Sequence, residues 1–69
     1  MSAIAQQLKA ARKQTGYSQS EVATILHVTR QSISKWETGR SYPDIDNLIQ
    51  LSDLYHVSVD ALVRADHEE

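Results

Sequence analysis

The chain has 69 residues, enough for one small domain and close to the lower size at which a hydrophobic core suffices without other support. It contains no cysteine, which excludes disulfides and thiolate-bound zinc as supports of the fold. No long apolar run opens the sequence, so we expect neither a signal peptide nor a membrane span, and we expect a cytoplasmic protein.

The small net charge of −2 conceals an uneven distribution along the chain. Residues 1–40 carry six Lys and Arg against two Glu, whereas residues 41–69 carry one Arg against seven Asp and Glu. A nucleic-acid-binding protein with a second, acidic surface would show this separation. A neutral domain with a chance distribution of surface charges would show the same separation, so charge alone does not distinguish a nucleic-acid-binding protein from such a domain.

The first two predicted helices cover residues 3–15 and the segment that begins at Gln19. In the first helix, Ile4, Leu8 and Ala11 follow the i, i+4, i+7 spacing of an amphipathic helix, and a glycine directly after residue 15 is a typical left-handed stop. The second helix is preceded by Ser18 and has a Glu three residues after it, which is the spacing of a capping box. The apolar side of this second helix consists of Val22, Ala23 and Leu26.

The third predicted helix runs from Arg30 to Thr38, directly after a short turn. Thr29 is a good N-cap for it, and Gly39 supplies a left-handed stop after its end. Ile33 and Trp36 are its apolar residues, three positions apart, so we expect Trp36 to anchor the core rather than to stack on a base. The opposite face is polar and carries Arg30, Gln31, Ser34 and Lys35.

The last two predicted helices cover residues 45–55 and residues 59 to about 64. Asp44 and Ser58 are their N-caps. The fourth helix has a broad apolar face that should make it central to the core, formed by Ile45, Leu48, Ile49, Leu51 and Leu54. We therefore expect an all-α, compact five-helix bundle over residues 1–64, followed by a short, frayed acidic tail over residues 65–69.

Two short helices joined by a three-residue turn, with the small Ala23 at their crossing, form a helix-turn-helix over residues 19–38. Three motifs agree with this: R-K-x-x-G-x-S-Q-x-E-V-A at residues 12–23, S-I-S-K-W-E-T-G-R at residues 32–40 and V-S-V-D-A-L at residues 57–62. With these motifs in register, the sequence resembles the Cro/repressor-type (XRE) helix-turn-helix family, to which small phage repressors belong. The resemblance covers about residues 8–63. It departs at His27, where the family usually has Gly; His tolerates the left-handed conformation at a small strain cost.

The polar face of the third helix is the predicted base-contacting surface. In a helix-turn-helix the N-terminal residues of the second helix meet base edges in the major groove. Arg suits guanine and Gln suits adenine, although Gln31 does not determine one base. By position, the resemblance implies contact roles for Arg30, Gln31 and Lys35, and we add Ser34. The alternative is an ordinary solvated helix face. Several relatives carry amides at positions 30 and 35, so binding here would be more electrostatic.

Candidates for DNA phosphate contacts lie at helix ends and in the following loop. Gln19 opens the first helix of the motif, where free N–H groups and the helix dipole favour an anion. Thr29, Arg40 and Ser41 are further candidates. Their alternative roles are capping and turn formation. The resemblance also implies a structural ion pair between Arg12 and Glu37, which would tie the first helix to the third.

Metal and catalytic sites are not expected. The three histidines, His27, His56 and His67, are not spaced as metal ligands on one face, and no Cys assists them. Carboxylates such as Asp53 near His56 lack a nucleophile, an oxyanion hole and a pocket, so we expect no enzyme and no cofactor.

The expected function is a sequence-specific regulator of transcription that binds double-stranded DNA, most simply a repressor acting sterically on palindromic operators. A homodimer would place two reading helices in successive major grooves, and Val59, Leu62 and Val63 are the predicted dimer interface. The alternative is an antitoxin or adaptor whose acidic face over residues 41–69 binds a protein partner. A third possibility is a DNA-binding module taken from a longer chain.

Overall fold

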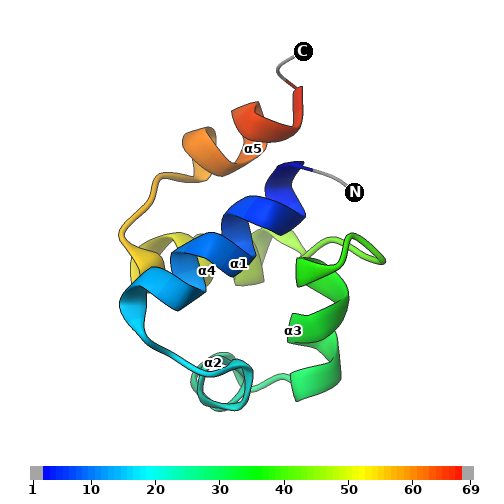
Figure 1. Ribbon diagram of the computed structural model, residues 1–69, viewed down its shortest axis with the longest axis vertical. Coiled ribbons are helices and arrows are strands. Elements are labelled where there is room, and N and C mark those ends of the chain that lie inside the picture. Colours follow the sequence, from blue (N-terminus) through cyan, green and yellow to red (C-terminus); the bar gives the residue numbers. More distant parts are fainter. Residues whose placement is uncertain (1–2, 68–69) are drawn as a thin grey trace.

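The computed structural model describes the backbone of residues 3–67 and the side chains of residues 3–64. Within this part of the chain every regular element is a helix: α1 (Ala3–Thr15), α2 (Gln19–Leu26), α3 (Arg30–Glu37), α4 (Ile45–Tyr55) and α5 (Val59–His67). Figure 1 shows α1 crossing in front of α4, with α3 at the side, α2 below and α5 above. The predicted all-α, five-helix fold is confirmed.

The caps that were predicted from sequence define the helix-turn-helix. The Ser18 hydroxyl accepts from the Glu21 backbone N–H at 3.0 Å, and the Glu21 carboxylate accepts from the Ser18 N–H at 2.8 Å. The Thr29 hydroxyl accepts from the Ser32 N–H at 3.1 Å and thereby begins α3. His27 ends α2 in the left-handed conformation, with φ 59°. These local bonds satisfy N–H groups that a helix cannot pair internally.

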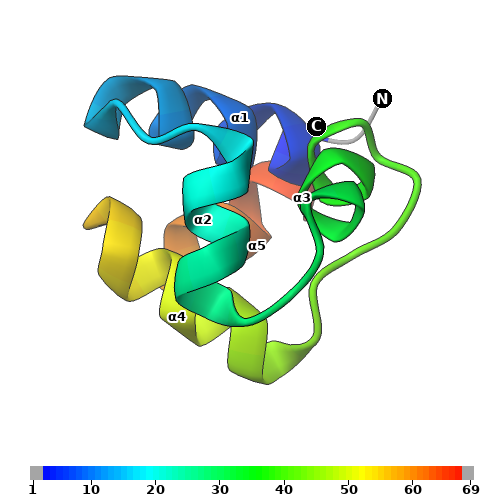
Figure 2. The ribbon, with the colours of Figure 1, turned by 90° about the horizontal axis from the view of Figure 1, so that it is seen from below.

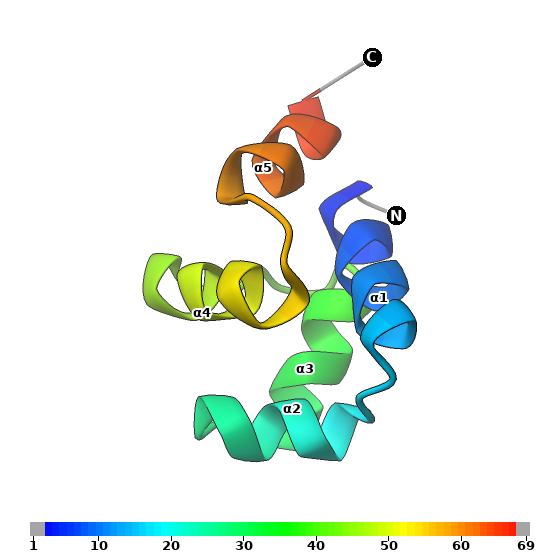
Figure 3. The same cartoon turned by 90° about the vertical axis from the view of Figure 1, so that its left-hand side faces the viewer.

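The core receives a fully buried side chain from each of the five helices: Leu8, Val22, Ile33, Leu51 and Leu62. Seen from below, α2 lies between α1 and α4, with α3 beside it (Figure 2). From the side, α4 and α1 flank the molecule, with α5 above and α2 below (Figure 3). This arrangement holds the inner side of α3 against the core and leaves its outer side facing solvent.

The broad apolar face predicted for α4 is only partly buried, so that prediction was wrong in extent. Leu48 and Leu51 are buried and Leu54 is half-buried, but Ile45 is 62% and Ile49 is 46% exposed. Residues four apart share one side of a helix, and the stripe that faces the core is only about 100° wide. The third buried side chain of α4 is that of Tyr55, at the end of the helix.

The C-terminal helix differs from the prediction in length and in burial. It continues to His67 rather than ending near residue 64, so the predicted frayed tail begins too early; residues 68–69 lie outside the described part of the chain. Leu62 is only 1% exposed and closes the core, so it offers no surface to a second copy, contrary to the prediction. Val59 is half-buried against the core, and Val63 is 38% exposed.

Candidate nucleic-acid interface

The polar face of α3 points to solvent because the apolar side chains on the opposite face of the helix are buried in the core. Ile33 is 1% and Trp36 is 7% exposed, which confirms Trp36 as a core residue. The helix begins at Arg30 and ends at Glu37, with Thr38 as its C-cap, one position before the predicted end. Gly39 follows with φ 79°, the left-handed stop that was expected.

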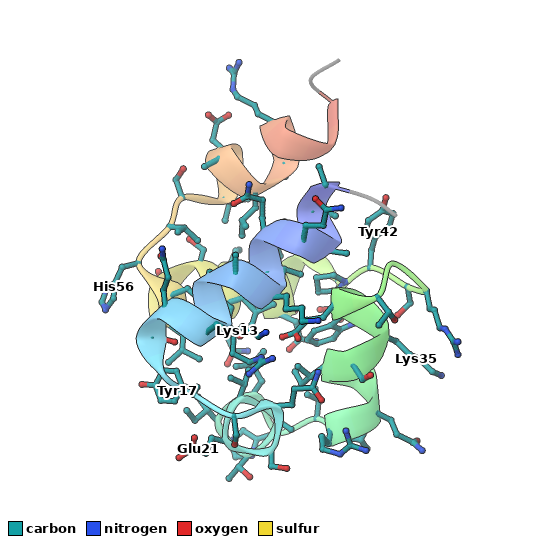
Figure 4. The ribbon with its side chains drawn as sticks, in the orientation of Figure 1. Lys13, Tyr17, Glu21, Lys35, Tyr42 and His56 are labelled. Carbon is teal, nitrogen blue, oxygen red and sulfur yellow. The ribbon has the colours of Figure 1, made fainter. Side chains whose placement is uncertain are left out.

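The four predicted base-contacting residues lie together on the outer side of α3. We call them the reading face: Arg30, Gln31, Ser34 and Lys35. Arg30, Gln31 and Lys35 are exposed and Ser34 is half-buried. In Figure 4 the Lys35 side chain points away from the bundle. Together with Thr38 and Arg40 the reading face lines one shallow hollow, which we call the α3 hollow.

A buried carboxylate lies behind the reading face. Glu37 is 3% exposed and accepts from Arg12, with 2.7 Å between Nε and Oε2 and 3.1 Å between Nη2 and Oε1. A third Arg12 nitrogen, Nη1, donates to the Tyr17 carbonyl at 3.0 Å. The predicted pair of Arg12 and Glu37 is therefore present as a two-bonded, charge-assisted contact between α1 and α3.

This buried pair changes the proton affinity of its neighbourhood. The hydrogen bond to Glu37 raises the pKa of Arg12 above its ordinary value, outweighing the opposing effect of burial. Burial raises the pKa of the Tyr55 hydroxyl, and the negative charge of Glu37 adds to that rise. Arg12 and Tyr55 therefore keep their protons over the whole physiological range.

Gln19 connects the buried pair to the reading face, a link that sequence reasoning missed. Its amide nitrogen donates to Glu37 Oε1 at 3.1 Å, and its amide oxygen accepts from Arg30 Nη1 at 3.1 Å. A continuous series of hydrogen bonds thus runs from Arg12 through Glu37 and Gln19 to Arg30. The only sequence signal was indirect: a buried carboxylate has acceptor capacity beyond one Arg, so a further donor should face it.

The predicted phosphate contacts lie at three separate helix ends. Gln19 begins α2, where its backbone N–H belongs to a first turn without intrahelical acceptors. The exposed Thr29 is the N-cap of α3. Arg40 and Ser41 follow its C-terminus, where their backbone N–H groups donate to the Lys35 carbonyl at 2.9 and 3.4 Å. All four positions border the reading face, and their phosphate roles stay predictions.

Comparison with known proteins identifies the family. Residues 8–62 match the family model of the HTH_3 helix-turn-helix. The chain belongs to the helix-turn-helix family. The resemblance inferred from the three sequence motifs is thereby confirmed, and the matched residues include the whole helix-turn-helix, all of α4 and parts of α1 and α5.

Three relatives show how closely the helix-turn-helix chain follows known members. The SPbeta prophage-derived HTH-type transcriptional regulator YonR of Bacillus subtilis is 39% identical over 93% of this chain and 59% of its own length. The P22 c2 repressor in complex with a synthetic operator superposes with a TM-score of 0.86 at 27% identity, over 96% of this chain and all of that one. SinR in complex with DNA superposes with a TM-score of 0.78 at 36% identity, over 87% of this chain and 97% of the SinR chain.

The extent of these matches differs between the two kinds of relative. The helix-turn-helix chain spans 59% of the length of YonR, so more than a third of that regulator has no counterpart here. In contrast, it covers 97% of the SinR chain that was solved with DNA. The likeness therefore concerns the helix-turn-helix domain itself.

Three further features of the described residues concern metal ligands, membrane spans and the predicted dimer contact. Among residues whose placement is described, no three His, Cys, Asp or Glu side chains are grouped as metal ligands. Within the same part of the chain, no helix is both long and apolar enough to cross a membrane. Of the predicted dimer residues, Val59 and Val63 remain partly accessible on α5, and Leu62 does not.

Proposed function

We propose that the protein is a sequence-specific transcriptional regulator that binds double-stranded DNA, and that it acts as a repressor by occupying a promoter. The observation that carries the proposal is the reading face: three exposed side chains with long reach, Arg30, Gln31 and Lys35, on a helix whose other side is locked into the core. The relatives support it, because two of them were solved in complex with an operator or with DNA.

In the proposed complex α3 lies in the major groove with its N-terminal residues against base edges. Arg30 would donate two hydrogen bonds to guanine, and Gln31 would pair with adenine or lie against a thymine methyl group. Gln19 holds the Arg30 guanidinium at 3.1 Å, so part of the ordering that base recognition requires is present before DNA arrives. The remaining predicted contacts, at Thr29, Arg40 and Ser41, would fix orientation without reading sequence.

We further propose that two copies bind one two-fold symmetric operator. A single α3 reads only a few base pairs, and two reading helices separated by one helical turn, about 34–36 Å, double the site. Val59 and Val63 on α5 are the proposed contact between the copies, without Leu62. We propose that this binding needs neither catalysis nor a cofactor, and that it takes place in the cytoplasm.

The decisive experiment is selection from a random pool of double-stranded DNA at about physiological salt. Enrichment of a two-fold symmetric sequence with half-sites about 10 bp apart would support a dimeric regulator. The matched control is the Arg30→Ala variant, which should lose the preference at one base position and keep the rest. Retention without any enriched sequence, or no retention, would contradict the proposal.

The antitoxin or adaptor alternative receives no support from these relatives, whose names describe transcriptional regulation and repression. Of the acidic residues that suggested it, those with described side chains are exposed on α4, α5 or a cap, and Asp44 and Asp60 serve the helix ends. Helix capping accounts for these two carboxylates without a partner protein.

A further inference from the structure

A second hollow lies between α1 and the C-terminal end of α3. Lys9 and Lys13, one helical turn apart, line it together with Gln6 and Ala10. Its remaining wall is formed by Glu37 and Thr38 at the end of α3. Both lysines are exposed, and Figure 4 shows Lys13 on α1. We call this surface the α1 hollow.

The α1 hollow and the α3 hollow meet at Thr38, which lines both. Five of the six cations of residues 1–40 belong to this joined surface: Lys9, Lys13, Arg30, Lys35 and Arg40. The sixth, Arg12, lies behind it and is neutralised by Glu37. The surface is therefore a continuous cationic strip that is longer than the reading face alone.

The positive charge of the α1 hollow is not cancelled locally. The one carboxylate in its wall, Glu37, is buried and already bound twice by Arg12. Within the described residues, the ion pairs are Arg12 with Glu37 and Arg64 with Asp60, so neither Lys9 nor Lys13 takes part in one. Two uncompensated lysines beside a DNA-reading helix are complementary to the densely charged phosphate backbone.

We propose that Lys9 and Lys13 form a second phosphate-binding track, which contacts the DNA backbone beside the groove that α3 enters. This inference rests on the proposed function, since it requires DNA on the reading face. Residues four apart lie about 6 Å apart along a helix, and the long lysine stems can reach successive phosphates of one strand. Such contacts strengthen and orient binding but carry no sequence information.

The test is the salt dependence of operator binding, measured by fluorescence anisotropy between 50 and 200 mM salt with the full chain. Removing one lysine that binds a phosphate should reduce the slope of log K against log salt by about 0.9. The Lys9→Gln/Lys13→Gln variant should therefore lower the magnitude of the slope by about 1.8. The loss of affinity between 50 and 200 mM salt should then be about tenfold smaller for this variant than for the unaltered protein. Its ranking of operator sequences should not change.

The matched control is Arg64→Gln, which removes one exposed cation on α5, away from both hollows. It should leave the slope unchanged, whereas the single Lys9→Gln change should lower it by about 0.9. An equal fall in both single variants would mean a general charge effect and would overturn the track. Circular dichroism melts should coincide for all variants, because the substituted side chains are exposed.

The outcomes separate this inference from the proposed function. Sequence-specific binding with an unchanged slope in the double variant would overturn the track and leave the regulator intact. If the α1 hollow instead served an acidic protein partner, the double substitution would abolish that complex without touching the salt slope, which again overturns the track. An unaltered protein that binds no DNA sequence preferentially would remove the proposed function, and the track with it.

Discussion

At the scale of single residues, two positions in the left-handed backbone conformation carry histidine, although glycine adopts this conformation with least strain. His27 and His56 both adopt φ 59° at helix ends, and Gly16 and Gly39 occupy the other two positive-φ positions among the described residues. A side chain in this conformation places Cβ close to the following carbonyl oxygen, which costs roughly 1–2 kcal/mol. The fold tolerates that cost twice, since each histidine ends a helix that the core already holds.

Replacing His27 by glycine should therefore stabilise the protein. We expect His27→Gly to raise the free energy of unfolding by about 1 kcal/mol, the strain relieved less the extra entropy of a glycine in the unfolded chain. Urea denaturation of the two proteins measures the difference. His27→Ala is the control, because it keeps Cβ and the strain. A glycine variant no more stable than the alanine variant would contradict the strain argument.

Removal of the Glu37 side chain should be strongly destabilising. Truncating its side chain leaves the largely buried Arg12 guanidinium without its partner, and breaking a buried pair in this way costs about 3 kcal/mol or more. We expect Glu37→Ala to lower the free energy of unfolding by that amount in urea denaturation. Glu37→Gln keeps one acceptor for Arg12 and should be less destabilising. A thermal melt of Glu37→Ala that matches the unaltered protein would show that the pair is dispensable.

At the scale of helices, the sequence patterns predicted where helices begin better than they predicted which face of each helix is buried. Ser18 and Thr29 were readable as caps because capping depends on residues within one turn. The exposure of Ile45 and Ile49 was not readable, since α4 offers more apolar side chains than its neighbours can cover. The Gln19 link to Arg30 was missed for the same reason: it joins two helices, and no local spacing encodes it.

The reading face gives the prediction that belongs to α3 as an element. Arg30→Ala or Gln31→Ala should weaken binding to the selected operator by about 1–3 kcal/mol and relax the preference at one base position. Lys35→Ala should mainly flatten the salt dependence if this lysine meets a phosphate rather than a base. Competition binding with single-base operator variants, carried out at several salt concentrations, measures all three.

The same experiment has an internal control in the stability of the variants. None of the three substitutions on the reading face removes a core side chain, so the thermal melt of Gln31→Ala should change little. A uniform decrease of affinity across all operator variants, with an unchanged salt slope, would contradict the assigned contacts of all three residues.

At the scale of the whole molecule, the charge separation noticed in the sequence becomes a separation in space. Five of the six cations of residues 1–40 gather along the strip formed by the α1 and α3 hollows, whereas the carboxylates of residues 41–69 that the structure describes belong to α4, α5 and their caps. A net charge of −2 therefore coexists with a cationic surface.

The same arrangement leaves two partly exposed apolar surfaces that could join two copies, Val59 with Val63 on α5 and Ile45 with Ile49 on α4. The proposed dimer uses α5. We therefore expect Val63→Asp to weaken binding to a complete palindrome at least tenfold while binding to an isolated half-site stays the same. Val63 is 38% exposed, so the monomer fold should survive the change.

Ile49→Asp is the matched control for this experiment, because it places the same charge at a comparably exposed apolar position, 46%, on α4. Analytical ultracentrifugation with and without operator DNA would compare the assemblies directly. If only Ile49→Asp disrupts the complex, the copies meet through α4. The dimer contact would then explain why the isoleucines of α4 are exposed in the single chain. A strict monomer, both free and on DNA, would contradict the dimer altogether and leave one α3 to read each site alone.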